Sequence, residues 1–141
     1  MTTFLKSKII FWFLLFLFSF ILNLAWEEFH SVLYLNYQGG IITHFILIRA
    51  SLADAIFISV LFSLTKVIKK IWLFPVLAIL LAFLIEKWAL GAGRWAYNSL
   101  MPVLPILRVG LSPFIQLAVT GIISQKITVL GCRFLKAGVI G

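Results

Sequence analysis

Four long apolar stretches alternate with short polar segments along the chain. They cover residues 9–34, 43–65, 71–90 and 112–129, with ends defined to within a few positions. An α-helix rises about 1.5 Å per residue, so each stretch is long enough to cross a hydrocarbon layer about 30 Å thick. The pattern therefore predicts an all-α fold, an integral membrane four-helix bundle in which residues 1–141 form a single transmembrane domain.

Glycine and proline mark the ends of the predicted helices. The segment 36–40, Asn-Tyr-Gln-Gly-Gly, follows the first stretch and ends it. Pro75 falls in the first turns of the third helix, where a missing backbone N–H is tolerated. Residues 91–93, Gly-Ala-Gly, loosen or end that helix. We expect the fourth helix to begin with Ser112 as its N-cap and Pro113 in its first helical position.

The segment 94–111 between the third and fourth helices does not fit a regular element. Pro102 and Pro105 prevent a regular helix, yet the segment is too apolar for a solvated loop. A non-helical backbone at membrane depth is tolerated only where it is buried in protein or faces water. We therefore expect this segment to lie on the mouth of the bundle or to fold back into it as a re-entrant loop.

Composition supports a membrane protein. The chain is 63% hydrophobic and 11% charged, with a mean hydropathy of +1.16. Lipid can solvate that much apolar surface, whereas a soluble domain of this length could not hide it. The net charge of +8 does not indicate nucleic-acid binding, because the basic residues stand in short groups at the ends of apolar stretches. Cys132 is the only cysteine, which excludes an internal disulfide.

The distribution of Lys and Arg predicts the orientation in the membrane. If the four helices alternate in direction, eight cations fall on one side, which the positive-inside rule places in the cytoplasm. We therefore expect a multi-pass protein of the cell inner membrane with cytoplasmic N- and C-termini. The first stretch is expected to be retained rather than cleaved as a signal, because Asn23 stands where a small residue is required. The eight cations are Lys6, Lys8, Lys66, Lys69, Lys70, Lys126, Arg133 and Lys136.

All acidic residues and both histidines fall toward the opposite, outer side. Glu27, Asp54 and Glu86 lie within apolar stretches, and by helical rise they reach the outer half of the hydrocarbon. A charge there costs on the order of 3 kcal/mol on insertion scales, so it is rarely incidental. Asn23, Glu27 and His30 share one helix face by their spacing, and Gln116 begins a second polar stripe. We predict that these stripes meet in a polar pocket below the outer surface.

The residue types suggest chemistry on a lipid or isoprenoid ligand. A desolvated carboxyl or imidazole is suited to general acid or base catalysis, and the catalytic candidates are Glu27, His30, Asp54 and Glu86. Guanidinium, aromatic and amide groups would hold a polar head and an apolar chain. The ligand-binding candidates are Arg49, Arg94, Trp95, Tyr97, Asn23 and Gln116.

Other interpretations stay open at this point. No cofactor follows from the sequence, and no metal site is predicted. A single Glu-x-x-His, Glu27 to His30, would need His44 or another group to complete a shell. Glu86 could instead form a structural ion pair with Lys87, Arg94 or Arg49. The alternative functions are a small transporter or proton-coupled carrier that acts as a homo-oligomer, and a structural or assembly subunit of a membrane complex.

Overall fold

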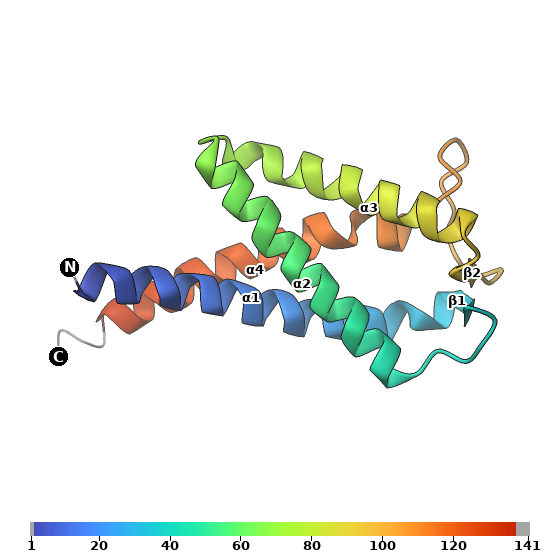
Figure 1. Cartoon of the computed structure of the whole chain (residues 1–141), viewed down its shortest axis with the longest axis horizontal. Coiled ribbons are helices and arrows are strands. Elements are labelled where there is room, and N and C mark those ends of the chain that lie inside the picture. Colours follow the sequence, from blue (N-terminus) through green and yellow to red (C-terminus); the bar gives the residue numbers. More distant parts are fainter. Residues whose placement is uncertain (1, 138–141) are drawn as a thin grey trace.

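The computed structural model describes residues 2–137, and it describes side chains from residue 7 to residue 135. Within this part of the chain, four long helices account for most of the residues, with two short 3-10 turns and a two-stranded sheet between them (Figure 1). The helices are α1 (Thr2–His30), α2 (His44–Val67), α3 (Phe74–Gly91) and α4 (Leu111–Ala137). The 3-10 turns are Ser31–Leu33 and Ile71–Leu73, and the strands are β1 (Tyr34–Tyr37) and β2 (Trp95–Tyr97).

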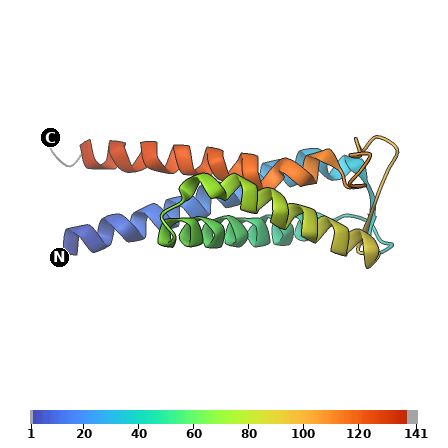
Figure 2. The ribbon, with the colours of Figure 1, turned by 90° about the horizontal axis from the view of Figure 1, so that it is seen from above.

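All four helices are long and apolar enough to cross a membrane, which confirms the predicted all-α membrane bundle. α1 packs against α2 and α4, and α3 packs against α4. Figures 1 and 2 show the ends of α1 and α4 that bear the chain termini at one end of the molecule, with β1 and β2 at the other. α2 and α3 are joined at their tips and diverge toward the end that carries the strands (Figure 1).

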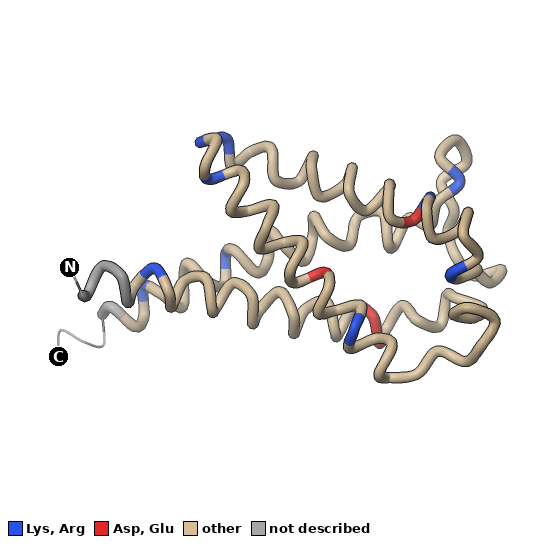
Figure 3. The backbone as a smooth tube through the Cα atoms, viewed as in Figure 1, with Lys and Arg blue, Asp and Glu red and all other residues tan. Residues whose placement is uncertain are grey.

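Charge is separated along the bundle as the sequence predicted. Figure 3 shows Lys and Arg at the turn between α2 and α3 and along the ends of α1 and α4 that bear the termini. Asp and Glu lie in the other half, toward the strands, where the remaining Lys and Arg also lie (Figure 3). The side chains of Lys6 and Lys136 are outside the described part. Which side of which membrane each end faces stays a prediction.

The helices extend further than hydropathy indicated. α1 begins at Thr2 rather than residue 9, and α4 continues to Ala137 rather than residue 129. Hydropathy measures the apolar length, whereas a helix continues through lysine and serine into the interface. At the other end, α1 stops at His30 rather than residue 34, because the chain turns there into β1.

The short-range signals at the other helix ends were largely correct. Pro75 lies in the first turn of α3, and Gly91 is the last residue of that helix. Gly93 follows with a φ of +63°, a left-handed conformation that glycine adopts without strain. The predicted start of α4 was wrong by two positions: the helix begins at Leu111, so Ser112 is inside it and not its N-cap, and Pro113 is its third residue.

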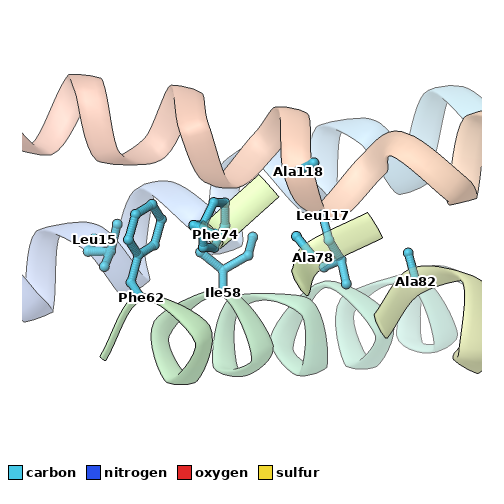
Figure 4. Packing of buried hydrophobic residues seen from close by; sticks show 8 residues of the cluster. All are labelled: Leu15, Ile58, Phe62, Phe74, Ala78, Ala82, Leu117 and Ala118. Atoms are coloured by element: carbon cyan, nitrogen blue, oxygen red, sulfur yellow. The ribbon is translucent and has the colours of Figure 1, made fainter. Parts of the chain in front are cut away.

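Buried apolar side chains pack into a core in the half of the bundle near the turn between α2 and α3 (Figure 4). The rings of Phe62 and Phe74 stack with centroids 3.8 Å apart. Gly121 of α4 lies directly against Phe74, and a Cβ at that position would overlap the ring. The remaining members of this cluster are Leu15, Ile58, Ala78, Ala82, Leu117 and Ala118.

The sheet at the opposite end was not predicted. β1 pairs with β2 in antiparallel register, Tyr34 opposite Tyr97 and Tyr37 opposite Trp95. The following segment, 98–110, lies at this end of the bundle (Figures 1 and 2), with Val109 buried and Ile106 94% exposed. The sequence allowed this segment either to cover the end of the bundle or to fold back into it as a re-entrant loop. In the structure the segment covers the end of the bundle.

Candidate binding site among the four helices

A cavity of about 290 Å³ lies on the side of the bundle where α2 and α3 diverge. Its walls come from all four helices and from both strands. Glu27, Asp54 and Glu86 all line it, so carboxyl groups from α1, α2 and α3 face one space. The apolar part of the wall includes Ile46, Leu47, Phe57, Ile85 and Leu117.

Gln116 of α4 connects two of these carboxyl groups. Its Nε2 lies 2.8 Å from Glu27 Oε1, 2.9 Å from Asp54 Oδ2 and 3.2 Å from Asn23 Oδ1. Thr120 Oγ1 lies 3.2 Å from Asn23 Oδ1, although its one proton is also within reach of its own helix carbonyl at Gln116, and Asn23 Nδ2 donates to a backbone carbonyl of α1. The amide of Gln116 therefore shares two N–H groups among three oxygens from α1 and α2.

The polar stripe of α4 explains why Gln116 faces inward. Gln116, Thr120, Ser124 and Thr128 follow at four-residue spacing, which places them on one helix face. All four are buried, and each of the three hydroxyl groups donates to the carbonyl four residues earlier. Gln116 reaches across the bundle to the carboxyl groups, and Thr120 adds a contact with Asn23, so these two members of the stripe build the site.

Glu86 is held by three neutral donors from the strands. Tyr34 OH donates to its Oε1 at 2.9 Å, while Trp95 Nε1 at 2.9 Å and Tyr97 OH at 2.8 Å donate to its Oε2. Tyr97 OH in turn accepts the backbone N–H of Gly110, which ties the segment 98–110 to the site. Burial, with the nearby charge of Glu86 acting in the same direction, raises the pKa of Tyr34 and Tyr97, so both phenols stay protonated as donors.

The alternative interpretation, an ion pair of Glu86 with Lys87, Arg94 or Arg49, is not found among the described side chains. Among the described side chains, no Lys or Arg forms an ion pair with any of the three cavity carboxyl groups. Arg49 lines the cavity but is exposed, with its guanidinium 5.8 Å from the Phe45 ring centroid. Arg94 does not line the cavity: it donates to Tyr37 OH and lies 5.4 Å from the centroid of the Trp88 ring.

The two histidines lie in different surroundings. His30 is buried, with its Nδ1 3.2 Å from Trp26 O and 3.9 Å from Glu27 Oε2, and its Nε2 3.4 Å from Tyr34 OH. His44 is exposed and pairs with Glu28 at 2.8 Å, outside the cavity. Within the described residues, no group of three or more His, Cys, Asp or Glu is arranged to hold a metal ion, so His44 does not complete a shell with His30.

The structure therefore brings together most of the residues that the sequence singled out. Those in contact with the cavity or with its carboxyl groups are Asn23, Glu27, His30, Asp54, Glu86, Trp95, Tyr97 and Gln116, with Arg49 at the rim. Arg94 and His44 lie outside it. Tyr34 and Tyr37 were missed, since both were assigned to the end of a helix and its linker.

Four membrane-length helices around a shared cavity define the class: the chain is a small multi-pass membrane protein built as a four-helix bundle. Comparisons with protein-family models, curated proteins and solved structures find no match to this chain. The geometry of the cavity is therefore the basis for assigning a function.

Proposed function

We propose that the protein binds a membrane amphiphile, a lipid or an isoprenoid, in the cavity between its four helices. The polar end of the ligand contacts the carboxyl groups and Gln116, and its apolar chain leaves between α2 and α3. One observation carries this proposal: the same helix, α2, lines the cavity with both a carboxyl group and apolar side chains. The carboxyl group is that of Asp54, and the apolar side chains include Leu47 and Phe57.

The size and depth of the cavity support an amphiphile rather than a water-soluble ligand. Its volume of about 290 Å³ is near the lower end of the range for small-molecule pockets, enough for a head group and part of a chain. Much of its wall belongs to helices that are long and apolar enough to cross a membrane, so a lipid would reach it laterally. Carboxyl groups kept at this depth are costly, and a bound polar group recovers part of that cost.

The three carboxyl groups have different roles in this proposal. Glu86 accepts three hydrogen bonds, so it is fixed in position and serves to orient the strands and the head group. Asp54 Oδ1 accepts no hydrogen bond from the described residues, and Glu27 Oε2 has only the 3.9 Å contact with His30. Asp54 and Glu27 are therefore the groups that would contact the ligand, and they are the candidates for acid or base if the ligand is chemically converted.

Native mass spectrometry of the protein released from its own membrane tests this proposal. We expect a bound lipid-sized mass that is lost in Ala50→Phe, since Ala50 lines the cavity. Leu52→Phe is the matched control, because Leu52 is 43% exposed on the outer face of α2 and should keep the ligand. Equal loss or equal retention of the ligand in both variants, with both folded, would contradict binding in the cavity.

A proton-coupled carrier is the second candidate, and one observation favours it. Glu86, Tyr34 and His30 form a continuous polar path, with Tyr34 OH 2.9 Å from Glu86 Oε1 and 3.4 Å from His30 Nε2. Such a path could pass protons between α3 and α1. Four helices are few for a carrier, so this function would require a homo-oligomer. Proton flux in liposomes that does not exceed that of empty vesicles removes this candidate.

The proposed location is a cell inner membrane, with both termini in the cytoplasm. The support is the grouping of Lys and Arg at the end that carries the termini. Cysteine-labelling at the turn between α2 and α3, from each side of sealed vesicles, tests the orientation. Labelling from the cytoplasmic side alone is expected, and labelling from the opposite side alone would reverse the topology.

A further inference from the structure

We infer that the amphiphile carries an ammonium group, primary or quaternary, at its polar end. This inference rests on the proposed function, because it specifies the head group of the ligand that the cavity binds. It follows from two features of the same space: carboxyl groups that pair with no described Lys or Arg, and a group of aromatic side chains beside them.

The charge balance of the cavity is incomplete. Glu27, Asp54 and Glu86 face one space, and none forms an ion pair with a Lys or Arg in the described part of the chain. The hydrogen-bond donors to these groups in the described part of the chain are an amide, two phenols and an indole, all neutral, and His30 Nδ1 lies 3.9 Å from Glu27 Oε2. Arg49 at the rim is exposed to solvent. A carboxyl group that carries its charge at such a site needs a compensating charge, and a cation that enters the cavity supplies it.

The aromatic wall selects the kind of cation. Tyr34, Tyr37 and Trp95 all line the cavity, brought together by the pairing of β1 with β2. The Trp95 ring lies 6.2 Å from that of Tyr34, at 90°, and 6.4 Å from that of Tyr37, at 24°. Trp95 and Tyr34 both donate to Glu86, so the rings and a carboxylate adjoin the same volume. Aromatic side chains combined with negative charge are how proteins recognise alkylammonium groups.

The arrangement distinguishes an ammonium from a metal ion. Within the described residues, no cluster of three or more ligating side chains fits a metal, and the carboxyl groups are spread over three helices. An ammonium head needs no such close shell, since it is larger and makes directional hydrogen bonds or ring contacts. The apolar walls at Ile46, Phe57 and Ile85 suit the alkyl chain attached to it.

Binding of matched amphiphiles to the delipidated protein in a nonionic detergent tests the inference. The probes are dodecylamine, dodecyltrimethylammonium, monolauroylglycerol and laurate, which share a chain length and differ in head group. We expect both ammonium probes to bind at least about tenfold tighter than the neutral one, a difference of about 1.4 kcal/mol. Laurate should bind weakest.

Variants locate the preference within the cavity. Asp54→Asn and Glu27→Gln should each reduce the preference for ammonium about tenfold, as expected for a lost charged contact. Glu28→Gln is the matched control, because Glu28 is the neighbouring carboxyl group but pairs with His44 outside the cavity. Tyr37→Phe should keep the affinity for dodecyltrimethylammonium and Tyr37→Leu should lower it several-fold, since only the ring is needed.

The outcomes separate this inference from the proposed function. If all four probes bind equally, or laurate binds best, the ammonium inference is overturned while the cavity remains a site for amphiphiles. If none binds and no lipid is found on the purified protein, both fail. The comparison among probes on the unmodified protein decides the inference even if a charge-removing variant does not fold.

Discussion

Replacing Gln116 with leucine removes the one side chain that, among the described residues, connects α4 to both α1 and α2 through hydrogen bonds. Leucine is similar in volume and is apolar, so the packing changes little. The Nε2 contacts with Asn23, Glu27 and Asp54 are lost together, at sites where water is scarce. Because Gln116 is only 5% exposed, the perturbation falls on buried groups.

The expected destabilisation follows from the three contacts. Hydrogen bonds between membrane helices contribute about 0.6 kcal/mol each on average, which gives about 1.2 kcal/mol for the two N–H groups. A buried acceptor left without a donor costs about 1–3 kcal/mol, which raises the total above that value. We therefore expect Gln116→Leu to lower the free energy of unfolding by at least about 2 kcal/mol. Reversible unfolding in mixed detergent micelles, followed by circular dichroism, measures it.

Gln125→Leu is the matched control on the same helix. Gln125 is half-buried and forms no hydrogen bond with the described residues, so the same substitution should change stability by less than about 0.5 kcal/mol. If the two variants were equally stable, Gln116 would not hold the carboxyl groups together. The network on which the cavity depends would then be absent.

Two further substitutions test the strands and the core. Folding raises the pKa of Tyr97 above its ordinary value of 10.0, chiefly through burial. The contribution of this group to the free energy of unfolding is therefore complete below pH 10.0 and declines as the pH rises above that value. Tyr97→Phe should therefore lose less stability than the unmodified protein above about pH 10 in alkaline titration of thermal unfolding; an identical decline would contradict the burial of this phenol beside Glu86. Gly121→Ala should destabilise the bundle by about 1–3 kcal/mol in denaturant unfolding, because the new methyl group overlaps Phe74. Gly131→Ala, whose Cβ meets only Leu14 at 3.7 Å, is the control, and an equal cost for both would refute tight packing at Gly121.

Helical periodicity predicted the part of the site that lies on regular helices. Asn23 and Glu27 share a face of α1, and Gln116 begins the polar stripe of α4, so their inward orientation follows from spacing alone. The cost of a charge in hydrocarbon then indicates that the stripes should meet. Their contact through one amide nitrogen could not be predicted, because it depends on how α1, α2 and α4 are placed relative to one another.

The part of the site on the strands was predicted only in outline. Trp95 and Tyr97 are two residues apart, so they lie on one face of a strand, and this spacing was the available signal. Their partner strand, residues 34–37, is about sixty positions earlier and only four residues long. A strand that short has too few residues to show a period. Arg94 illustrates the same difficulty, since the pairing of β1 with β2 directs it to Tyr37 rather than into the cavity.

Cross-linking between α1 and α2 tests the central claim most directly. Glu27 Oε1 and Asp54 Oδ2 both lie within 3 Å of the same nitrogen, at 2.8 and 2.9 Å. In a Cys132→Ser background, the pair Glu27→Cys with Asp54→Cys should be joined rapidly by a short thiol-specific cross-linker in native membranes. The pair Glu28→Cys with Asp54→Cys should react slowly, because Glu28 points to His44 outside the cavity. Rapid linking of the second pair with none of the first would contradict a shared cavity for these carboxyl groups.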